Sequence, residues 1–236
     1  MHRLGSSLVN WYLVADDGRL TAVDAGLPGF KNTLEADLAR LGHSTADIEA
    51  LILTHSDGDH TGLARALHEA GARVLIHSGD EPSLRKPGLK PGDASPPHLL
   101  RELWRPGLWR LFAAMAISGG AMPKPFEGAE TFSDGDLLDV PGAPRVIATP
   151  GHTVGHCAFH FERHGALVVG DALCTKNPIT GSRGPQVMPS FLNVSTEQCV
   201  ASLALLEDVA ADVMLAGHGE PWRGQPAAAI AAARAR

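Results

Sequence analysis

Short apolar runs alternate with segments of helical period along most of this chain. Runs of four to six apolar residues, bounded by Gly, Pro or Asp, predict strands. The predicted strands are 8–14, 20–24, 50–53, 73–76, 136–140, 145–148, 157–161, 166–169 and 212–215, with a hairpin across 16–18. Apolar residues at helical spacing predict helices over 31–41, 61–70, 97–115 and 196–209. This alternation predicts an α/β fold in which two sheets are covered by helices.

Composition and charge are typical of a globular chain that acts on small molecules. The 236 residues are 44% apolar and 19% charged, which is enough to bury a core and excludes a disordered chain. The net charge is −6 and the sequence has no run of Lys or Arg, so we expect no nucleic-acid partner. No apolar run approaches the ~20 residues of a membrane-spanning helix, and the N-terminus lacks the features of a secretory signal. We therefore expect a cytoplasmic protein with a small-molecule substrate and no membrane partner.

The strongest chemical signal follows the predicted strand 50–53. The sequence over 54–60 is Thr-His-Ser-Asp-Gly-Asp-His, which places four potential metal ligands within six residues. In an extended loop, the side chains of His55, Asp57 and Asp59 project to one side, while His60 points elsewhere. A turn of this kind can serve two metal ions a few ångströms apart. The structural alternative is a solvated acidic helix N-terminus, because Asp and Ser favour that position.

Three further turns carry a potential metal ligand where a predicted strand ends. His152, Asp171 and His218 each follow such a strand, and each stands next to a glycine. A single histidine at a strand end is usually a hydrogen-bonded structural residue. Packing alone does not explain all four turns together, so they predict a shared metal site.

With these motifs the chain resembles the metallo-β-lactamase superfamily. The likeness covers nearly the whole chain and rests on 10–14 with 23–26, 55–60, 149–153, 170–171 and 217–219. It implies an αβ/βα four-layer sandwich, in which two mixed β-sheets are flanked by helices. It also implies a single domain over 1–236, with a helical lid-like insertion at about 80–130.

The resemblance also implies a role for each potential ligand. The implied ligands are His55, Asp57 and His152 for a first metal, Asp59, His60 and His218 for a second metal, and Asp171 as the bridge between them. The implied reaction is hydrolysis by a water or hydroxide held between two divalent ions, with zinc as the first expectation. Asp59 is the implied catalytic residue, which orients the nucleophile and passes a proton to the leaving group. Asp24 is expected either next to the ligands or as a β-turn residue, and His156 as a structural hydrogen-bonding residue.

The chain departs from the usual HxHxDH pattern at one position, where Asp57 stands in place of the second histidine. Three aspartates then carry −3 against +4 for two divalent ions, and a bridging hydroxide brings the total to zero. A less positive cluster acidifies its water less, and an oxygen ligand favours Mn²⁺ or Fe²⁺ relative to Zn²⁺. The alternative is that Asp57 binds no metal and that only the second site is occupied.

The substrate class stays open on the sequence alone. A small-molecule ester, lactone, thioester or related compound is the first expectation from the resemblance. A non-haem iron oxidoreductase of flavodiiron-like or dioxygenase type is the alternative, because flavodiiron proteins have a carboxylate, in an HxExDH pattern, at the position of Asp57. A metal-binding fold without catalysis is a third hypothesis, weakened because every other ligand position is filled.

The segment 97–117 within the insertion carries an apolar stripe that is interrupted at Pro106-Gly107. An apolar stripe at helical spacing is usually part of a core. The alternatives are a lid over the metal cleft that favours an apolar substrate, and the contact surface of a homodimer. Trp104 and Trp109 lie in this segment, and aromatic side chains of this kind line pockets and interfaces.

Overall fold

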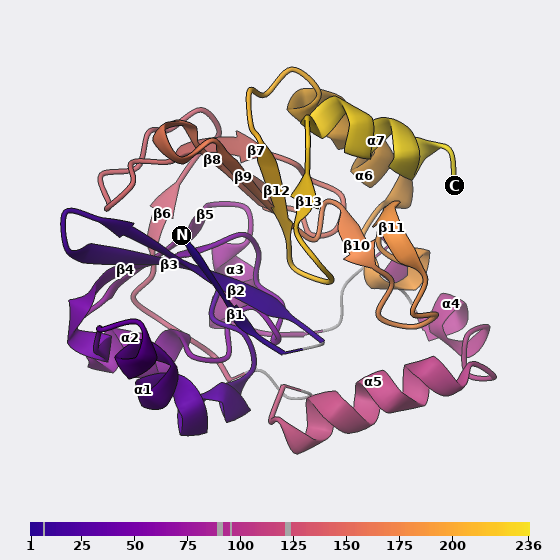
Figure 1. Cartoon of the computed structure of the whole chain (residues 1–236). Helices are drawn as coiled ribbons and strands as arrows, with labels where there is room; N and C mark the ends of the chain where they lie inside the picture. Colours follow the sequence, from indigo (N-terminus) through magenta and orange to yellow (C-terminus); the bar gives the residue numbers. More distant parts are fainter. Residues whose placement is uncertain (7, 89–91, 95, 121–123) are drawn as a thin grey trace.

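Two β-sheets pack face to face, and helices cover the outer face of each sheet (Figure 1). The computed structural model describes residues 1–6, 8–88, 92–94, 96–120 and 124–236. The first sheet consists of β1 His2–Gly5, β2 Asn10–Asp16, β3 Arg19–Val23, β4 Ile48–Leu53, β5 Arg73–His77 and β6 Glu130–Phe132. The second sheet consists of β7 Arg145–Ala148, β8 Cys157–Phe161, β9 Ala166–Gly170, β12 Val213–Ala216 and β13 Trp222–Arg223, and a separate hairpin pairs β10 Cys174–Lys176 with β11 Arg183–Gln186.

Both sheets are mixed, as the resemblance implied. In the first sheet, β1, β2 and β3 pair antiparallel, and β3, β4, β5 and β6 pair parallel. The second sheet runs in the order β13-β12-β9-β8-β7, and only β12 and β9 pair parallel. The predicted hairpin across 16–18 is present, because Asp16 pairs with Arg19. Asp17 and Gly18, at φ 50° and 79°, form the two-residue turn that this geometry requires.

The helices lie on the two outer faces of the sandwich or in the insertion. They are α1 Lys31–Arg40, α2 Ala64–Glu69, α3 Glu81–Arg85, α4 Pro96–Leu100, α5 Pro106–Ile117, α6 Thr196–Ser202 and α7 Pro226–Arg234. Short 3-10 turns occur at Pro28–Phe30, Thr45–Asp47, Gly92–Ala94, Glu162–His164, Ser190–Leu192 and Leu203–Leu206. None of the helices in the described part of the chain is long and apolar enough to cross a membrane.

The central strands of the first sheet are apolar on both faces because each face contacts a different core. On β4, Leu51 and Leu53 pack with the α1 and α2 side chains, whereas Ala50 and Ile52 pack against the second sheet. The core between the two sheets contains Phe159, which is fully buried. A third core joins the second sheet to the 3-10 turn Leu203–Leu206 and to α7. The strand pattern of period two therefore produces the four-layer αβ/βα architecture, and the predicted fold class is confirmed.

One predicted strand is wrong. The segment 136–140 makes only an isolated bridge between Leu137 and Arg145, at the end of β7. Two features prevent a regular ladder here. Pro144 has no N–H to donate, and Ala143 adopts a φ of 40° in the turn between the two segments. The sequence pattern at 136–140 shows the alternation of a strand but does not show how the following turn disrupts pairing.

Three predicted helices have different bounds in the structure. The predicted helix 196–209 is α6, which ends at Ser202, followed by the 3-10 turn Leu203–Leu206. The predicted helix 97–115 is two helices, α4 and α5, because Pro106 lacks an N–H and therefore begins α5 rather than continuing α4. The predicted helix 61–70 begins only at Ala64. The amides of Gly62 and Leu63 donate instead to the carbonyls of Gly26 and Ala25, which fixes the preceding turn against the end of β3.

Within the insertion at about 80–130, Leu84 of α3 and Phe126 pack into the core on the outer face of the first sheet, whereas α4 and α5 lie outside the four layers, with α5 at the lower right of Figure 1. Its residues 89–91, 95 and 121–123 fall outside the described part of the chain. The expectation that its stripe is core is wrong for most of α5, where Leu108 is the buried residue. Leu108 packs with Ile179 and Phe191 in a small separate core. Helix α5 is thus attached to the segment that follows β10, and just beyond its end the carbonyl of Ser118 accepts the amide of Gly29.

Candidate metal centre

Four turns meet at one end of the sandwich, and each turn follows a strand. The turn 54–60 follows β4 in the first sheet. His152, Asp171 and His218 lie on turns that follow β7, β9 and β12 of the second sheet. The site is therefore built from both sheets, and the mutual position of its side chains depends on how the sheets pack.

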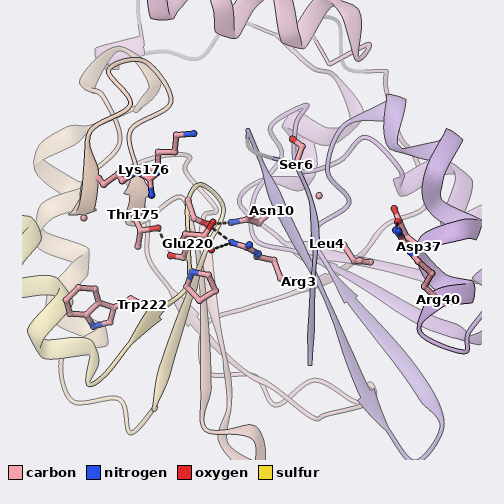
Figure 2. Close-up of a pocket in the computed structure, with 15 residues that line it drawn as sticks. Arg3, Leu4, Ser6, Asn10, Asp37, Arg40, Thr175, Lys176, Glu220 and Trp222 are labelled. Atoms are coloured by element: carbon pink, nitrogen blue, oxygen red, sulfur yellow. Dashed lines mark hydrogen bonds and ion pairs between the residues drawn. The ribbon is translucent and has the colours of Figure 1, made fainter.

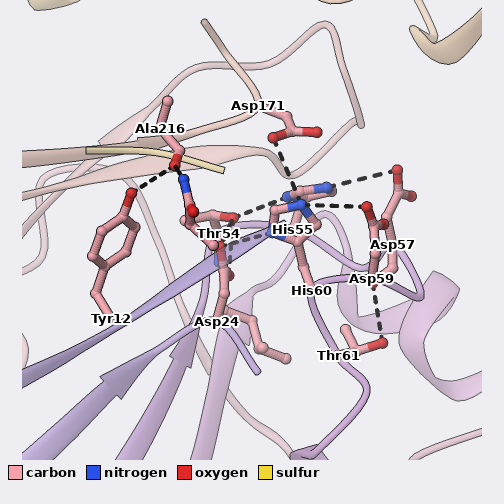
Figure 3. Close-up of polar contacts among 12 residues, drawn as sticks. Tyr12, Asp24, Thr54, His55, Asp57, Asp59, His60, Thr61, Asp171 and Ala216 are labelled. Atoms are coloured by element: carbon pink, nitrogen blue, oxygen red, sulfur yellow. Dashed lines mark hydrogen bonds and ion pairs between the residues drawn. The ribbon is translucent and has the colours of Figure 1, made fainter. Parts of the chain in front are cut away.

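All seven residues predicted from the sequence surround one small site, which we call the seven-residue cluster. They form three overlapping groups, and the ligand atoms of each group lie within 4.8 Å of one another. The groups are His55, Asp57 and His152; His55, His60 and Asp171; and Asp59, His60 and His218. Because His55 and His60 each belong to two groups, the three groups form a continuous cluster. Figure 3 shows its members from the turn 54–60 together with Asp171.

Asp57 lies in the part of the cluster that contains His55 and His152. Its Oδ2 is 3.1 Å from His152 Nε2 and 3.6 Å from His55 Nε2. The Asp57 side chain is 24% exposed, whereas the two imidazole rings are almost fully buried. Asp57 therefore completes a three-residue group from its solvent-facing side.

Asp171 lies between the two parts of the cluster. Its Oδ2 is 3.1 Å from His218 Nε2 and 3.7 Å from His152 Nε2, and its Oδ1 is 3.6 Å from His60 Nε2. Asp59 Oδ2 is 3.6 Å from His218 Nε2 and 3.9 Å from His60 Nε2. The Asp171 carboxylate thus faces histidines of both parts of the cluster, which is the position that a shared metal ligand needs.

The ring orientations of His55 and His60 are both fixed through Asp24. His60 Nδ1 donates to Asp24 Oδ2 at 2.8 Å. The Thr54 hydroxyl donates to the same carboxylate and accepts from His55 Nδ1 at 2.9 Å. Asp24, with a φ of 61°, therefore lies next to the ligands, as one expectation had it, and not in a β-turn. With the Nδ1–H of both rings donated, Nε2 of each ring faces the cluster and is the nitrogen that a metal ion would take.

His152 and His218 are oriented in the same way by other partners. His152 Nδ1 donates to Asn193 Oδ1 at 2.9 Å, and the Asn193 amide group donates in turn to the Met188 carbonyl. His218 Nδ1 donates to the carbonyl oxygen of Leu8. All four histidines of the cluster therefore present Nε2 to the same small space, which is the tautomer that metal ligation requires.

Three buried atoms in the cluster have no hydrogen-bond partner among the described residues. They are His55 Nε2, His60 Nε2 and Asp171 Oδ1. An unsatisfied buried polar atom costs about 1–3 kcal/mol, and the loss is larger for a charged group. Divalent cations would satisfy all three atoms at once, because imidazole nitrogen and carboxylate oxygen are common ligands of zinc and iron. The donor set therefore fits metal ions.

The pKa shifts report a strong concentration of charge in the cluster. Burial lowers the pKa of His60, but the carboxylates of Asp171 and Asp24 outweigh burial and raise it to about 10. His218 responds in the same way to burial and to Asp171, and its pKa rises to about 9. Burial also raises the pKa of Asp171, yet the neighbouring His218 and His60 rings hold it well below its usual range. The same negative charge that favours protonated histidines also attracts divalent cations.

His156 is a structural residue of the site, as expected from the sequence. Its Nδ1 lies 2.8 Å from Thr149 Oγ1, and its Nε2 accepts the backbone N–H of Asp171 at 3.0 Å. Burial, together with the neighbouring rings of His55 and His152, holds the pKa of His156 well below its usual value. A neutral His156 is therefore available to fix the backbone that carries Asp171.

A cavity of about 480 Å³ opens onto the cluster. Its floor includes Asp57, Asp59, His152, Asp171 and His218. The opposite side is formed by α5 and by parts of the segment between β10 and α6. A molecule in this cavity contacts the predicted metal ligands directly.

The comparison with known proteins identifies the family of this chain. A model of the metallo-beta-lactamase superfamily matches residues 4–218. The chain belongs to this superfamily. Within the superfamily, the uncharacterized protein YobT of Bacillus subtilis (strain 168) is 31% identical over 223 residues, which cover 90% of this chain and 83% of YobT. The probable metallo-hydrolase YflN of the same organism is 25% identical over 241 residues, covering 95% of this chain and 86% of YflN.

Solved structures of the metallo-beta-lactamase superfamily share the fold. The metallo-beta-lactamase family protein TTHA1429 from Thermus thermophilus is 28% identical, with a TM-score of 0.66. That match covers 95% of this chain and 72% of TTHA1429. The names of the relatives and the cluster together support a metal-dependent hydrolase in general terms.

Several residues that organise this metallo-beta-lactamase site were missed by the sequence analysis. The carboxylate of Asp80, which is buried, accepts the amides of Ser56 and Gly155 at 2.9 and 2.7 Å and so joins two ligand turns. Asn193 is fully buried and orients His152. No local motif marks either residue, because their partners are distant in the sequence.

The turn that carries His218 is also held from the first sheet. Tyr12 Oη donates to the Ala216 carbonyl at 2.7 Å, as Figure 3 shows, and Asn10 Nδ2 donates to the same carbonyl at 2.9 Å. A Cβ at Gly217 would lie 2.2 Å from Asp171 Oδ1. Glycine is therefore required at 217, because any side chain there would collide with the cluster.

Proposed function

We propose that this protein is a hydrolase that acts on a small-molecule ester, lactone, thioester or related substrate at a centre of two divalent metal ions. One observation carries the proposal: four Nε2 atoms and three carboxylates from four separate turns converge on one site. Three of their buried atoms have no hydrogen-bond partner in the described residues. The cavity of about 480 Å³ gives a small molecule access to these groups.

The proposed ligand assignment follows the distances within the cluster. We assign His55, Asp57 and His152 to the first ion and Asp59, His60 and His218 to the second. Asp171 would contact both ions. Support for this role comes from its Oδ2 near His152 and His218 and its Oδ1 near His60. Asp57 supplies an oxygen where a histidine is usual, so Mn²⁺ and Fe²⁺ are included with Zn²⁺ among the candidate ions.

The chemistry that the ions supply when bound is twofold: they lower the pKa of water from ~15.7 towards ~7, and they polarise a substrate carbonyl oxygen. The protein positions the groups. Asp59 is partly exposed and borders the cavity, so its carboxylate can accept a proton from the attacking water and donate it to the leaving group. The hydrogen bonds at Nδ1 of the four histidines hold the remaining donors in place. A Ser or Cys nucleophile is not needed for this route.

Metal analysis combined with a substrate panel tests the proposal. Protein purified without added metal should contain up to two divalent ions per chain and should hydrolyse at least one ester, lactone or thioester. His55→Ala should lose both metal and turnover, whereas His2→Ala, on exposed strand β1, should keep both. A fully active His55→Ala protein without metal would contradict the proposal. Bound iron together with turnover of oxygen or nitric oxide would contradict the hydrolase proposal and favour the oxidoreductase alternative. Protein that binds no metal would also contradict the hydrolase proposal.

A further inference from the structure

The wall of the cavity above the cluster differs sharply from its floor. The floor carries the carboxylates and imidazoles already described. The remaining lining residues are Gly58, Leu111, Phe112, Met115, Ala116, Gly120, Pro178, Met188 and Leu192. None of these nine has a charged side chain or a side chain that forms conventional hydrogen bonds. Among the described residues, the substrate surface beyond the cluster is therefore apolar.

Helix α5 supplies four of these nine residues, because its side chains repeat at helical spacing. Leu108, Leu111 and Met115 lie three and four residues apart, so they share one face of the helix. Leu108 is buried against Ile179 and Phe191, which fixes that face towards the segment after β10. Leu111 and Met115 continue the same face over the cavity.

The backbone of α5 lies close to the segment that follows β10. A Cβ at Gly107 would lie 1.7 Å from the carbonyl oxygen of Ile179, so the backbone of α5 rests directly on this segment. Glycine at 107 permits this contact. The wall is therefore held at a defined distance from the cluster, and its apolar side chains line the cavity above the cluster.

The charges around the site argue against an anionic substrate. The three aspartates of the cluster offset most of the +4 charge that two divalent ions would bring. A substrate carboxylate or phosphate needs a cationic or strongly donating partner to offset its lost hydration. The lining residues named above provide none away from the cluster.

Cationic side chains line two other cavities. One, of about 310 Å³, is lined by Lys31, Arg65 and Lys124 among others; it meets the cavity at the cluster at Gly58, but its cations do not line that cavity. A larger cavity of about 720 Å³ is lined by Arg3, Lys176 and Arg183, among others (Figure 2). It shares no lining residue with the cavity at the cluster. In that second cavity Arg3 is paired with Glu220 at 2.7 Å. The positive groups of this region therefore do not contact a molecule that is seated on the cluster.

We propose that the substrate is an uncharged ester or lactone with an apolar acyl or aryl group, and that this group packs against Leu111, Phe112 and Met115 while the carbonyl lies over the cluster. This inference rests on the proposed hydrolase function and specifies its substrate class. The apolar wall selects for the length of the acyl group, because each methylene that leaves water contributes about 0.8 kcal/mol, a factor of roughly four.

A series of 4-nitrophenyl esters measures this selection. We expect kcat/KM to rise from acetate through butyrate and hexanoate to octanoate, by roughly two- to fourfold per methylene until the cavity is filled. The mono-4-nitrophenyl ester of adipic acid has the length of the hexanoate but ends in a carboxylate. It should react at least about tenfold more slowly than the hexanoate ester, because its charge would be buried against apolar groups.

Two helix variants with the same substitution locate the effect. Met115→Gln lines the cavity, and Ile117→Gln lies two residues away on α5, where the side chain is 88% exposed. Met115→Gln should flatten the chain-length series with little change for the acetate, and Ile117→Gln should leave the series unchanged. Phe112→Gln, at a position 38% exposed, provides a second cavity variant that does not threaten folding. Metal content should be the same in all three variants.

Binding of the uncharged fluorophore N-phenyl-1-naphthylamine gives a readout that does not depend on turnover. We expect saturable binding to the purified protein that is weakened about fivefold or more by Met115→Gln and is unaffected by Ile117→Gln. Equal weakening by both variants would place the probe on the exposed face of α5 and would overturn the inference.

The outcomes separate this inference from the function on which it rests. Hydrolysis with no dependence on chain length, or with preference for the adipate monoester, would overturn the apolar substrate class and leave the hydrolase intact. Probe binding that depends on Met115, with no hydrolysis of any ester, lactone or thioester, would support the apolar ligand and contradict the hydrolase.

Discussion

The ligand turns and the insertion are held in place in different ways. His55, His60 and Asp171 are almost fully buried, and further buried hydrogen bonds fix their rings or their backbone. On the insertion, Trp104 and Ile117 are 73% and 88% exposed. The small core that α5 joins consists of few residues, and this core involves the segment after β10 rather than the sheets. This contrast indicates that the reaction centre is part of the folded sandwich, whereas the wall above it can change with little cost to stability.

The largest effect is expected at the shared carboxylate. Asp171→Asn removes a charge that faces both parts of the cluster, so turnover should fall by about 1000-fold or more and the bound metal should drop below two ions per chain. Metal analysis and steady-state kinetics measure both quantities. Asp17→Asn, in the exposed β2–β3 turn, is the matched control and should behave as wild type. Two ions retained with full turnover in Asp171→Asn would remove Asp171 from the centre.

A Phe→Ala substitution made once between the sheets and once on α5 compares how much each region contributes to the free energy of unfolding. Phe159 is fully buried between the sheets, so Phe159→Ala should lower the free energy of unfolding by about 3–5 kcal/mol. Phe112→Ala, on α5, should cost less than about 1 kcal/mol. Urea unfolding of both variants makes the comparison. Equal losses would show that the insertion is as much a part of the core as the sheets are.

A smaller effect is expected where the ligands are oriented rather than removed. Asn193→Ala takes the acceptor from His152 Nδ1, so metal affinity should fall about 10- to 100-fold in competition with a chelator. Asn193→Asp keeps an acceptor oxygen and should recover most of the affinity. Asn32→Ala, on the exposed side of α1, is the control and should have no effect. If Asn193→Ala binds metal as tightly as wild type, the orienting role of Asn193 is wrong.

The smallest effect concerns the contact between the insertion and α6 at low pH. Asp93 Oδ2 accepts the amide of Thr196 at 2.8 Å, and this backbone hydrogen bond lowers the pKa of Asp93. The contact therefore stabilises the protein above the ordinary pKa of an aspartate and is lost as the pH falls through the lowered value. After correction for the intrinsic exchange rate at each pH, hydrogen exchange at the Thr196 amide should become faster in acid, because the amide loses its protection.

A variant isolates this titration from the protonation of the histidines. Asp93→Asn has no carboxylate, so exchange at the Thr196 amide should lose the additional pH dependence while the rest of the chain behaves as wild type. The same acceleration in wild type and Asp93→Asn would attribute it to another group.

The chemistry of the site could be predicted from the sequence because it follows the ends of strands. The run 50–53 and the His-x-Asp-x-Asp-His segment after it are local, and the structure brings all seven predicted residues together. The strands were readable for the same reason, since residues such as Leu51 and Ile52 alternate between two apolar cores. Local alternation is retained wherever both faces of a strand are buried.

The rest depends on contacts between distant residues. Asn193 orients His152 and the Leu8 carbonyl orients His218, across 41 and 210 positions of the chain. No spacing rule detects such partners. The stripe on α5 was misjudged as core because its periodicity does not show what covers it. The strand expected at 136–140 failed because the turn that follows it disrupts pairing with β7.

Anomalous X-ray diffraction from crystals of the metal-loaded protein tests the central claim most directly. The account predicts two anomalous peaks, one among His55, Asp57 and His152 and one among Asp59, His60 and His218, with Asp171 in contact with both. A single peak away from these side chains, or no peak in protein that contains metal, would contradict it.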